Sequence, residues 1–353
     1  MRNGWRCSAA VAYLRPARRR PNLVVRTGCL TRHVVVEDGR ARGVAYRQDG
    51  AHRVAFARGE IVLSAGAIGS PQILMLSGIG PAEELKALGI EPKVDLPGVG
   101  RNLQDHYQIR AVYRAPEPVT INDAVRSWWG KGLAGLRFAL SRSGPLALAA
   151  GCVAVFARTR PELETPDVQF HVIPFSAERP GEDLHTFPGY TLSVCQLRPE
   201  SRGHLRLKSA DPDVQPLIYP NYLATEADRR TMVDGVGLIR RVMAQPAVRP
   251  FVAEEVVPGP VVQDAAAILD YVRAKGTTIF HPSGTCAMGP DNNAMAVTDP
   301  RLRVRGVRGL RVADCSIMPT VPSGNTNAPA IMVGEKCAAM IREDARATVR
   351  RTT

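Results

Sequence analysis

The chain has 353 residues, of which 45% are hydrophobic and 22% charged, and this composition excludes a disordered or fibrous protein. The formal net charge of +13 raises the possibility of a nucleic-acid partner. However, 40 of the 46 basic residues are Arg, and they are spread along the whole chain rather than gathered on one segment. We therefore expect no nucleic-acid partner.

The seven cysteines are well separated and form no C-x-x-C pair, so a disulfide framework is not expected. The first 20 residues lack the continuous apolar segment of a signal peptide, and no run approaches the ~18 apolar residues of a membrane-spanning helix. These features favour a cytoplasmic protein. Peripheral association with the inner face of the membrane stays open.

The first third of the chain reads mainly as strands. Residues 8–14 are typical of the end of a helix, and the β-rich stretch 22–29 predicts a strand. Residues 33–56 alternate short apolar runs with Asp-Gly breaks, which indicates a meander of strands. Ile61–Leu63 predicts a buried strand, and a helix is expected to follow.

That strand leads through the small residues Ala65, Gly66 and Ala67 into the helix, for which Ser70 is expected as cap and Pro71 in the first turn. Small residues between a strand and a helix N-terminus let a ligand approach the backbone. The pattern alone is weak, because any α/β unit can contain it.

From about Glu117 to Gly276 the pattern changes to grouped strands flanked by helices, which predicts an α+β domain with a largely antiparallel sheet. Helices are expected at 127–144, 225–245 and 264–275, and strands at 167–175, 190–199 and 203–212. The chain then returns to turn-rich sequence, with one strand at 309–316 and a terminal helix from about Ala328 to Asp344.

The stretch "FHPSGTCAMG" at 280–289 contains a histidine that can be interpreted in three ways. His281 could bind zinc together with Cys286, but a structural zinc site takes four ligands and no further C-x-x-C or H-x-x-x-H is present. It could also be an ordinary loop histidine. The third interpretation is a catalytic base, because an imidazole accepts a proton near neutral pH.

A second stretch, "ADCSIMPTVPSGNTNAPAIM", follows the first. Asp314 is expected to end a strand, and 323–327 to form a small polar turn. Asn327 stands where a helix N-cap belongs, with Pro329 in the first turn. The positive end of such a helix stabilises a negative charge, and the reduced flavin is one ligand that carries it.

Four motifs together resemble the glucose-methanol-choline oxidoreductases, flavoproteins that oxidise alcohols. They are "AGAIGSPQILMLSGIGP", "LPGVGRNLQDH", "HPSGTCAMG" and "LRVADCSIMPTVPSGNTNAPAIM". The chain is most similar to the choline dehydrogenase and alcohol dehydrogenase branch. The resemblance implies an α/β plus α+β fold, in which an incomplete Rossmann-like FAD domain (1–116 and 277–353) contains an inserted antiparallel-sheet substrate domain (117–276).

The resemblance also implies roles for individual residues. His281 would take the proton of the substrate hydroxyl while a hydride passes to flavin N5, and Asn325 would hydrogen-bond the substrate oxygen. Thr31 stands where relatives usually have a Val near the adenine of FAD, so that contact would be altered. The residues expected to contact FAD are Thr31, Ala65, Gly66, Phe280, Ala313, Asp314, Thr326 and Asn327. Neither the alcohol nor the electron acceptor is indicated.

One feature of the family has no counterpart in this chain: a G-x-G-x-x-G turn that follows a strand and opens a helix, which receives the FAD pyrophosphate. By the resemblance the chain begins in mid-protein, through a truncated or misassigned reading frame or a split gene. We therefore expect the isolated chain to fold poorly or to bind FAD weakly. The alternatives to an active alcohol dehydrogenase are a catalytically silent remnant or interaction fragment, and a relative of the hydroxynitrile lyases.

Overall fold

A computed structural model of the protein describes residues 3–149, 151–179 and 181–352. The chain forms two compact units, each assembled from separate segments. Unit 1 comprises Met1–Leu23, His106–Glu200 and Thr225–Ile279, and unit 2 comprises Val24–Asp105, Ser201–Ala224 and Phe280–Thr353. These bounds differ from those expected for an FAD domain at 1–116 and 277–353 and a substrate domain at 117–276. The division into an FAD domain and a substrate domain stays a prediction.

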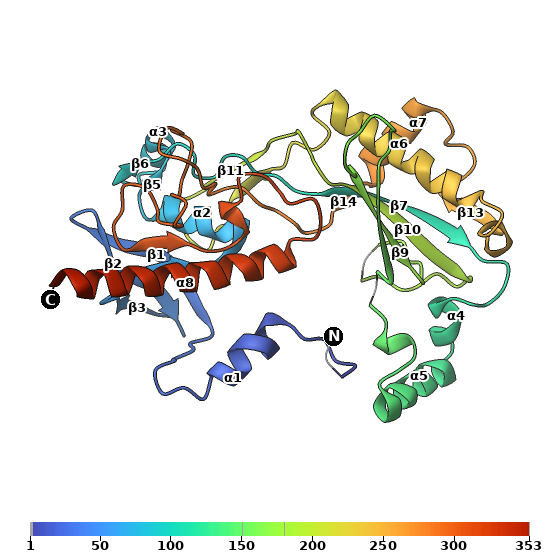
Figure 1. The fold of residues 1–353 in the computed structure, drawn as a ribbon, viewed down its shortest axis with the longest axis horizontal. Coiled ribbons are helices and arrows are strands. Elements are labelled where there is room, and N and C mark those ends of the chain that lie inside the picture. Colours follow the sequence, from blue (N-terminus) through green and yellow to red (C-terminus); the bar gives the residue numbers. More distant parts are fainter. Residues whose placement is uncertain (1–2, 150, 180, 353) are drawn as a thin grey trace. The chain divides into compact units, whose positions relative to one another are not determined.

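Unit 1 is built around an antiparallel six-stranded sheet (Figure 1). The strand order is β13-β7-β10-β9-β8, and β14 also pairs with β7. The strands are β7 (Tyr107–Arg114), β8 (Val153–Ala157), β9 (Val168–Ile173), β10 (Gly189–Gln196), β13 (Glu254–Val257) and β14 (Thr277–Thr278).

Two long helices, α6 (Glu226–Met243) and α7 (Ala265–Lys275), lie beside this sheet (Figure 1). The side chain of Thr225 caps α6 by accepting the N–H of Asp228, and Asp264 caps α7 in the same way. Gly235 lets α6 approach the sheet closely, because a Cβ there would lie 2.9 Å from Cγ2 of Val194. The helices therefore cover one face of the sheet.

The rest of unit 1 consists of short helices and one exposed helical hairpin. The hairpin is formed by α4 (Ile121–Arg126), which has a Thr120–Asp123 capping box, and α5 (Trp128–Ser141). The other elements are η1 (Ala10–Leu14), α1 (Arg15–Ala17), η2 (Pro145–Ala147) and η3 (Arg249–Phe251).

Unit 2 contains the expected meander, in which β1 (Cys29–Glu37), β2 (Arg40–Gln48) and β3 (Ala51–Phe56) pair antiparallel. Two Asp-Gly pairs, at 38–39 and 49–50, connect these strands with positive φ at both residues. This is the geometry of the two-residue hairpin turns that Asp-Gly favours.

The strands that carry the candidate site in unit 2 are β4 (Ile61–Leu63) and β15 (Leu310–Val312), which pair in parallel. Around them a buried apolar cluster includes Leu74, Val297 and Val333. The remaining elements of unit 2 are α2 (Gly66–Leu76), β5 (Ile79–Gly80), α3 (Ala82–Ala87), β6 (Val94–Asp95), β11 (His204–Arg206), β12 (Leu217–Tyr219), η4 (Cys315–Ile317) and α8 (Asn327–Thr352).

The expected α/β plus α+β fold class is confirmed, but several local predictions are wrong. Residues 22–28 form no strand, and Val24 is 76% exposed, because no neighbouring strand pairs with them. The strands β7, β8 and β13 were not anticipated. Helix α8 begins at Asn327 itself, since the carbonyl of Thr326 already accepts the N–H of Ala330.

Candidate active site

The ends of β4 and β15 bring together four of the residues expected to contact a cofactor. The N–H of Ala313 bonds the carbonyl of Leu63 at 2.8 Å, which aligns the two strand ends. Directly beyond them, Oδ2 of Asp314 accepts the N–H of Gly66 at 2.9 Å and the hydroxyl of Ser70 at 2.5 Å. Ser70 Oγ in turn accepts the N–H of Ala65 at 3.1 Å. Ligands commonly bind at this edge of parallel strands.

Helix α2 begins at Gly66, five residues earlier than the sequence predicted, so Pro71 lies inside the helix rather than in its first turn. Proline has no N–H, and the carbonyl of Ala67, four residues before it, therefore lacks its usual helical donor. The hydroxyl of Thr285 donates to this carbonyl at 2.6 Å. Pro71 is thus tolerated, and the hydrogen bond from Thr285 joins α2 to the loop that carries His281.

The loop at 280–289 is held by buried polar groups. Oδ1 of Asp105 accepts the N–H of His281 at 2.9 Å, and Oδ2 accepts the hydroxyl of Tyr222 at 2.5 Å. Gln104 exchanges two backbone hydrogen bonds with Ser283. His281 itself is only 8% exposed. The backbone of His281 is therefore held in place by the carboxylate of Asp105.

The two residues expected to be catalytic lie within reach of each other. Nδ2 of Asn325 is 3.3 Å from Nε2 of His281, although the two residues are 44 positions apart in the sequence. If the amide donates, Nε2 is the unprotonated ring nitrogen and Nδ1 carries the hydrogen. This is the tautomer in which Nε2 can accept a proton.

Cys286 lies in the same loop but is fully buried, and its N–H bonds the carbonyl of Ser316. Burial raises the pKa of its thiol well above the usual range, so the thiol stays protonated at neutral pH. Protonated thiols do not ligate metals. Within the described parts of the chain, no group of three or more His, Cys, Asp or Glu residues is arranged to hold a metal ion.

The other residues of this region that were expected to contact FAD lie at the start of the 280–289 loop and at the start of α8. Phe280 has a positive φ of 66° and a side chain that is 76% exposed. Thr326 is buried immediately before α8, and Asn327 is the first residue of that helix. Gly66 also has positive φ, and a Cβ there would meet no atom within 4 Å, so space is open beside its backbone.

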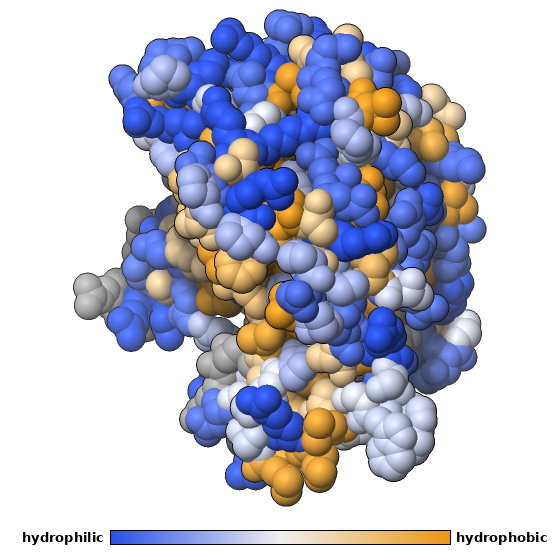
Figure 2. Space-filling model, turned by 90° about the vertical axis from the view of Figure 1, so that its right-hand side faces the viewer, coloured by the Kyte–Doolittle hydropathy of each residue, from blue (hydrophilic) through white to orange (hydrophobic). Residues whose placement is uncertain are grey.

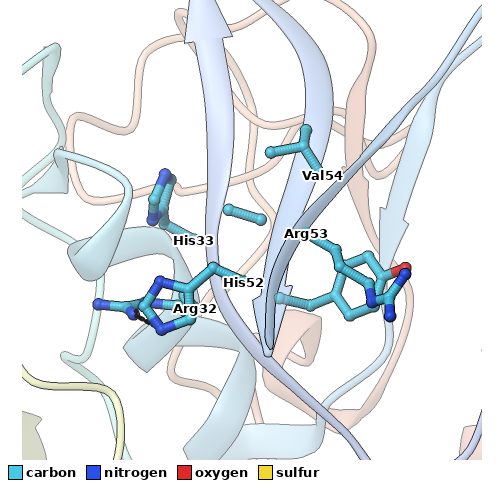
Figure 3. A pocket seen from close by; sticks show the side chains of 7 residues that line it. Arg32, His33, His52, Arg53 and Val54 are labelled. Atoms are coloured by element: carbon cyan, nitrogen blue, oxygen red, sulfur yellow. Dashed lines mark hydrogen bonds between the residues drawn. The ribbon is translucent and has the colours of Figure 1, made fainter. Parts of the chain in front are cut away.

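Thr31 does not belong to this cluster. It lies on β1, where it is paired with Tyr46 of β2. Its neighbour Arg32 lines a cavity of about 430 Å³ on the three-stranded sheet, together with His33, His52 and Arg53 (Figure 3). The guanidinium of Arg32 lies 2.9 Å from Nε2 of His52. This cavity is basic, and nothing in the sequence analysis anticipated it.

Three residues of the site were not predicted from the sequence. Asp105, Tyr222 and Gln104 hold the His281 loop, yet no role was assigned to them. The "NLQDH" motif that contains Gln104 and Asp105 was the available signal, because a carboxylate and an amide precede its histidine. Their partners lie 117 to 217 residues away, so local patterns could not identify them.

Comparison with known families gives two matches to the description "GMC oxidoreductase", one for the N-terminal part of the family at residues 1–108 and one for the C-terminal part at 199–334. The chain belongs to the GMC oxidoreductase family. The expected resemblance is thereby confirmed, and both matches include parts of the site described above.

Curated GMC relatives are named choline dehydrogenase and alcohol dehydrogenase. The chain is 41% identical over 341 residues to an oxygen-dependent choline dehydrogenase of Vibrio vulnificus, covering 97% of this chain and 61% of that protein. It is 43% identical to the mitochondrial choline dehydrogenase of Homo sapiens (96% and 57% covered) and 42% identical to an alcohol dehydrogenase [acceptor] of Pseudomonas putida (96% and 62% covered). The chain spans about three fifths of the length of the curated relatives it matches.

Solved structures share the same fold. Pyridoxine 4-oxidase of Mesorbium loti matches with a TM-score of 0.83 and 29% identity, over 97% of this chain and 63% of that one. A variant of formate oxidase from Aspergillus oryzae RIB40, studied for its FAD modification, matches with a TM-score of 0.86 and 27% identity, over 94% and 63% of the two chains. The fold of this GMC oxidoreductase chain is therefore that of flavin-dependent oxidases.

Proposed function

We propose that this chain contributes the catalytic part of an FAD-dependent oxidation of an alcohol to an aldehyde, with His281 as the base. The observation that carries the proposal is the 3.3 Å approach of Asn325 Nδ2 to His281 Nε2. The names of the relatives favour an alcohol or choline as substrate. The electron acceptor is not part of the proposal.

The residues at the strand ends are suited to FAD. Backbone groups of Ala65, Gly66 and Ala313 stand at the end of a parallel pair, and the open space beside Gly66 leaves room for a ring or a phosphate. Phe280, Thr326 and Asn327 would complete the contacts, and Thr31 would lie toward the adenine. FAD, when bound, supplies the hydride acceptor.

The side chains of this chain would divide the remaining work. Nε2 of His281 would take the hydroxyl proton of the alcohol, which a neutral imidazole does well near pH 7. The Asn325 amide would donate a hydrogen bond to the developing alkoxide without competing for the proton. Asp105 would keep His281 in position through its backbone N–H.

Turnover of 1-butanol tests the assignment of the base, measured with added FAD under air and, separately, with an artificial dye as electron acceptor. His281→Ala should lower turnover by ~10²- to 10⁴-fold, which is the usual effect of losing a positioned base. His52→Ala is the matched control, because His52 is an exposed histidine of the same unit. Equal turnover of the His281→Ala variant and the unaltered chain would refute the role.

Two further outcomes separate the alternatives. Asn325→Ala should reduce turnover with little change in folding; loss of FAD retention alone would make Asn325 a cofactor residue. If no form of the folded chain turns over any alcohol, the catalytically silent alternative is favoured instead.

The proposal extends to peripheral membrane association. Among the described residues, no helix has the length and apolarity needed to cross a bilayer. Helix α5, however, exposes a stripe of Trp129, Leu133, Leu136 and Leu140, each at least 56% exposed. Apolar residues gather at the lower end of the face in Figure 2. No Asp or Glu occurs from 124 to 161, whereas several basic residues do. Such a helix suits an anionic lipid surface.

Sedimentation with vesicles tests this association. The chain should pellet with phosphatidylcholine vesicles that contain phosphatidylglycerol, and less with phosphatidylcholine alone, because basic residues flank the apolar stripe. Leu133→Glu should abolish pelleting, whereas Val261→Glu, at another exposed apolar position, should not. Pelleting of both variants like the unaltered chain would exclude α5 as the contact.

A further inference from the structure

The backbone of Gln104 lies alongside the loop that carries His281. The N–H of Gln104 donates to the carbonyl of Ser283 at 3.0 Å, and the N–H of Ser283 donates to the carbonyl of Gln104 at 2.8 Å. The hydroxyl of Ser283 in turn donates to the carbonyl of His281 at 3.1 Å. All three residues belong to unit 2. The backbone of Gln104 therefore has a fixed position relative to His281.

The side chain of Gln104 bonds a different segment, the one that leads to Asn325. Its Nε2 donates to the carbonyl of Pro319 at 3.0 Å, and its Oε1 accepts the N–H of Val321 at 3.2 Å. Because a carbonyl only accepts and an N–H only donates, these partners fix the orientation of the amide. Gln104 is 2% exposed, so water does not compete for these bonds. Gln104 thus joins the two loops, one through its backbone and the other through its side chain.

Asn102 supports the same arrangement. Its Nδ2 donates to the carbonyl of Gly284 at 3.3 Å and to that of Pro319 at 3.1 Å. Its Oδ1 accepts the Gln104 amide at 3.1 Å. This approach requires glycine at 284, because a Cβ there would lie 2.4 Å from the carbonyl oxygen of Asn102. Two neighbouring amides therefore hold the Pro319 carbonyl.

The connection from Val321 to Asn325 is short and restrained. Three residues separate them, and the first, Pro322, has a fixed φ. The carbonyl of Pro322 accepts the N–H of Gly324 at 2.7 Å. Helix α8 begins at Asn327, directly after this segment. Asn325 therefore lies between the segment that Gln104 holds and the start of α8, and a shift of that segment would move the Asn325 amide.

The contact between Asn325 and His281 is sensitive to such a shift. Nδ2 of Asn325 lies 3.3 Å from Nε2 of His281, which is at the long end of the hydrogen-bond range. A further displacement of about half an ångström would break the bond. The bonds of the Gln104 side chain are therefore placed to control this contact.

We propose that Gln104 is a positioning residue for the oxidation, because its side-chain amide holds the Asn325 amide within hydrogen-bond distance of His281 Nε2. This inference rests on the proposed function, which gives His281 and Asn325 their roles. The position needs one neutral side chain that both donates and accepts, which an amide provides. Methionine has a similar length and supplies neither group, so Gln104→Met removes the bonds without emptying the space.

Nitrogen-15 NMR of the histidine rings tests the contact in the chain without FAD. The His281 signals are those that the His281→Ala variant lacks. Asn325→Ala should shift the Nε2 signal of His281 because the donated hydrogen bond is lost, and Gln104→Met should shift it in the same direction. Gln196→Met is the matched control, because Gln196 is a 4% exposed glutamine of unit 1 that bonds Asp228. An unmoved signal in Gln104→Met, with a shifted signal in Asn325→Ala, would overturn the positioning role.

Turnover of 1-butanol gives a second readout. Gln104→Met should lower kcat by about tenfold, and by no more than Asn325→Ala does, because a misplaced group loses part of its effect. In the Asn325→Ala background the same substitution should lower kcat no further, since Gln104 acts through Asn325. Effects that multiply in the double variant would show that Gln104 acts by another route, and would refute the proposal.

The two proposals fail in different ways. If the chain oxidises 1-butanol and depends on His281, but Gln104→Met changes neither the His281 signal nor kcat, the positioning role is refuted while the oxidation stands. If Gln104→Met shifts the signal but no form oxidises an alcohol, the link between the loops stands and the proposed oxidation fails.

Circular dichroism of each variant verifies folding. If Gln104→Met is unfolded, Asn102→Gly replaces it, because this substitution removes one donor to the Pro319 carbonyl at a residue whose φ of 59° glycine adopts freely. Asn102→Gly should shift the His281 signal in the same direction as Asn325→Ala, by a smaller amount. An unmoved signal in that variant would count against the role in the same way.

Discussion

At the scale of single residues, the support of His281 depends on one carboxylate. Asp105 accepts a backbone N–H with one oxygen and a tyrosine hydroxyl with the other, and it is 8% exposed. Both donors would lose their acceptor if the carboxylate were removed. Buried donors without acceptors are costly because water cannot replace the lost bond.

Asp105→Ala should therefore lower the free energy of unfolding by about 1–3 kcal/mol and reduce turnover, since the His281 backbone loses its anchor. Tyr222→Phe removes one bond only and should cost about 0.5–1.5 kcal/mol. Urea unfolding followed by circular dichroism measures both, with Glu335→Ala on exposed α8 as the control. An Asp105→Ala variant as stable as the control would show that the two hydrogen bonds contribute nothing.

At the scale of elements, helix α2 and the His281 loop are joined by the bond from Thr285 to the carbonyl of Ala67. Thr285→Val should cost about 1–3 kcal/mol, because this carbonyl is then left without a donor. Pro71→Ala restores a helical N–H for the same carbonyl. In the Pro71→Ala background, Thr285→Val should therefore be milder by about 1 kcal/mol, a difference that a double-mutant cycle in urea measures. Strictly additive effects of the two substitutions would contradict this account.

At the scale of the whole molecule, sequence patterns predicted the elements whose formation depends on residues within one segment. Helices α6 and α7 were predicted because their caps and apolar spacing lie within one segment. Residues 22–28 were wrongly predicted as a strand, because β-branched residues favour strands only when a neighbour pairs with them. Strand β7 was missed although its residues alternate, because its polar positions, Gln108 and Arg110, do not resemble the usual covered face of a sheet.

The candidate site was predicted in part for the same reason. His281 and Asn325 lie in short motifs whose residue types suggest their chemistry, and the structure brings them together. Asp105 meets the N–H of His281 across 176 positions, and nothing local marks that contact. The family resemblance supplied the candidate roles, and the fold supplied the residues that hold them in place.

The net charge of +13 also belongs to the whole molecule, and its distribution argues against binding to nucleic acid. In unit 2 a groove of about 1500 Å³ is lined by six arginines, but by five carboxylates as well. Several are paired, as Arg311 is with Glu60 and Asp344, and Arg305 is with Asp291. An arginine that is already paired with a carboxylate neutralises a phosphate less well, so few counterions are released from the nucleic acid.

We therefore expect no binding to a 30-base-pair duplex tighter than ~1 µM at about 0.15 M salt, measured by fluorescence anisotropy. Combined Asp291→Asn and Asp344→Asn should strengthen the weak binding seen at low salt, because three arginines of the groove, Arg303, Arg305 and Arg311, then each lose a partner. Salt should abolish that binding steeply, as it does for contacts to phosphate alone. Tight binding by the unaltered chain at physiological salt would mean that the unpaired arginines form a selected surface, and that the charge is not merely dispersed.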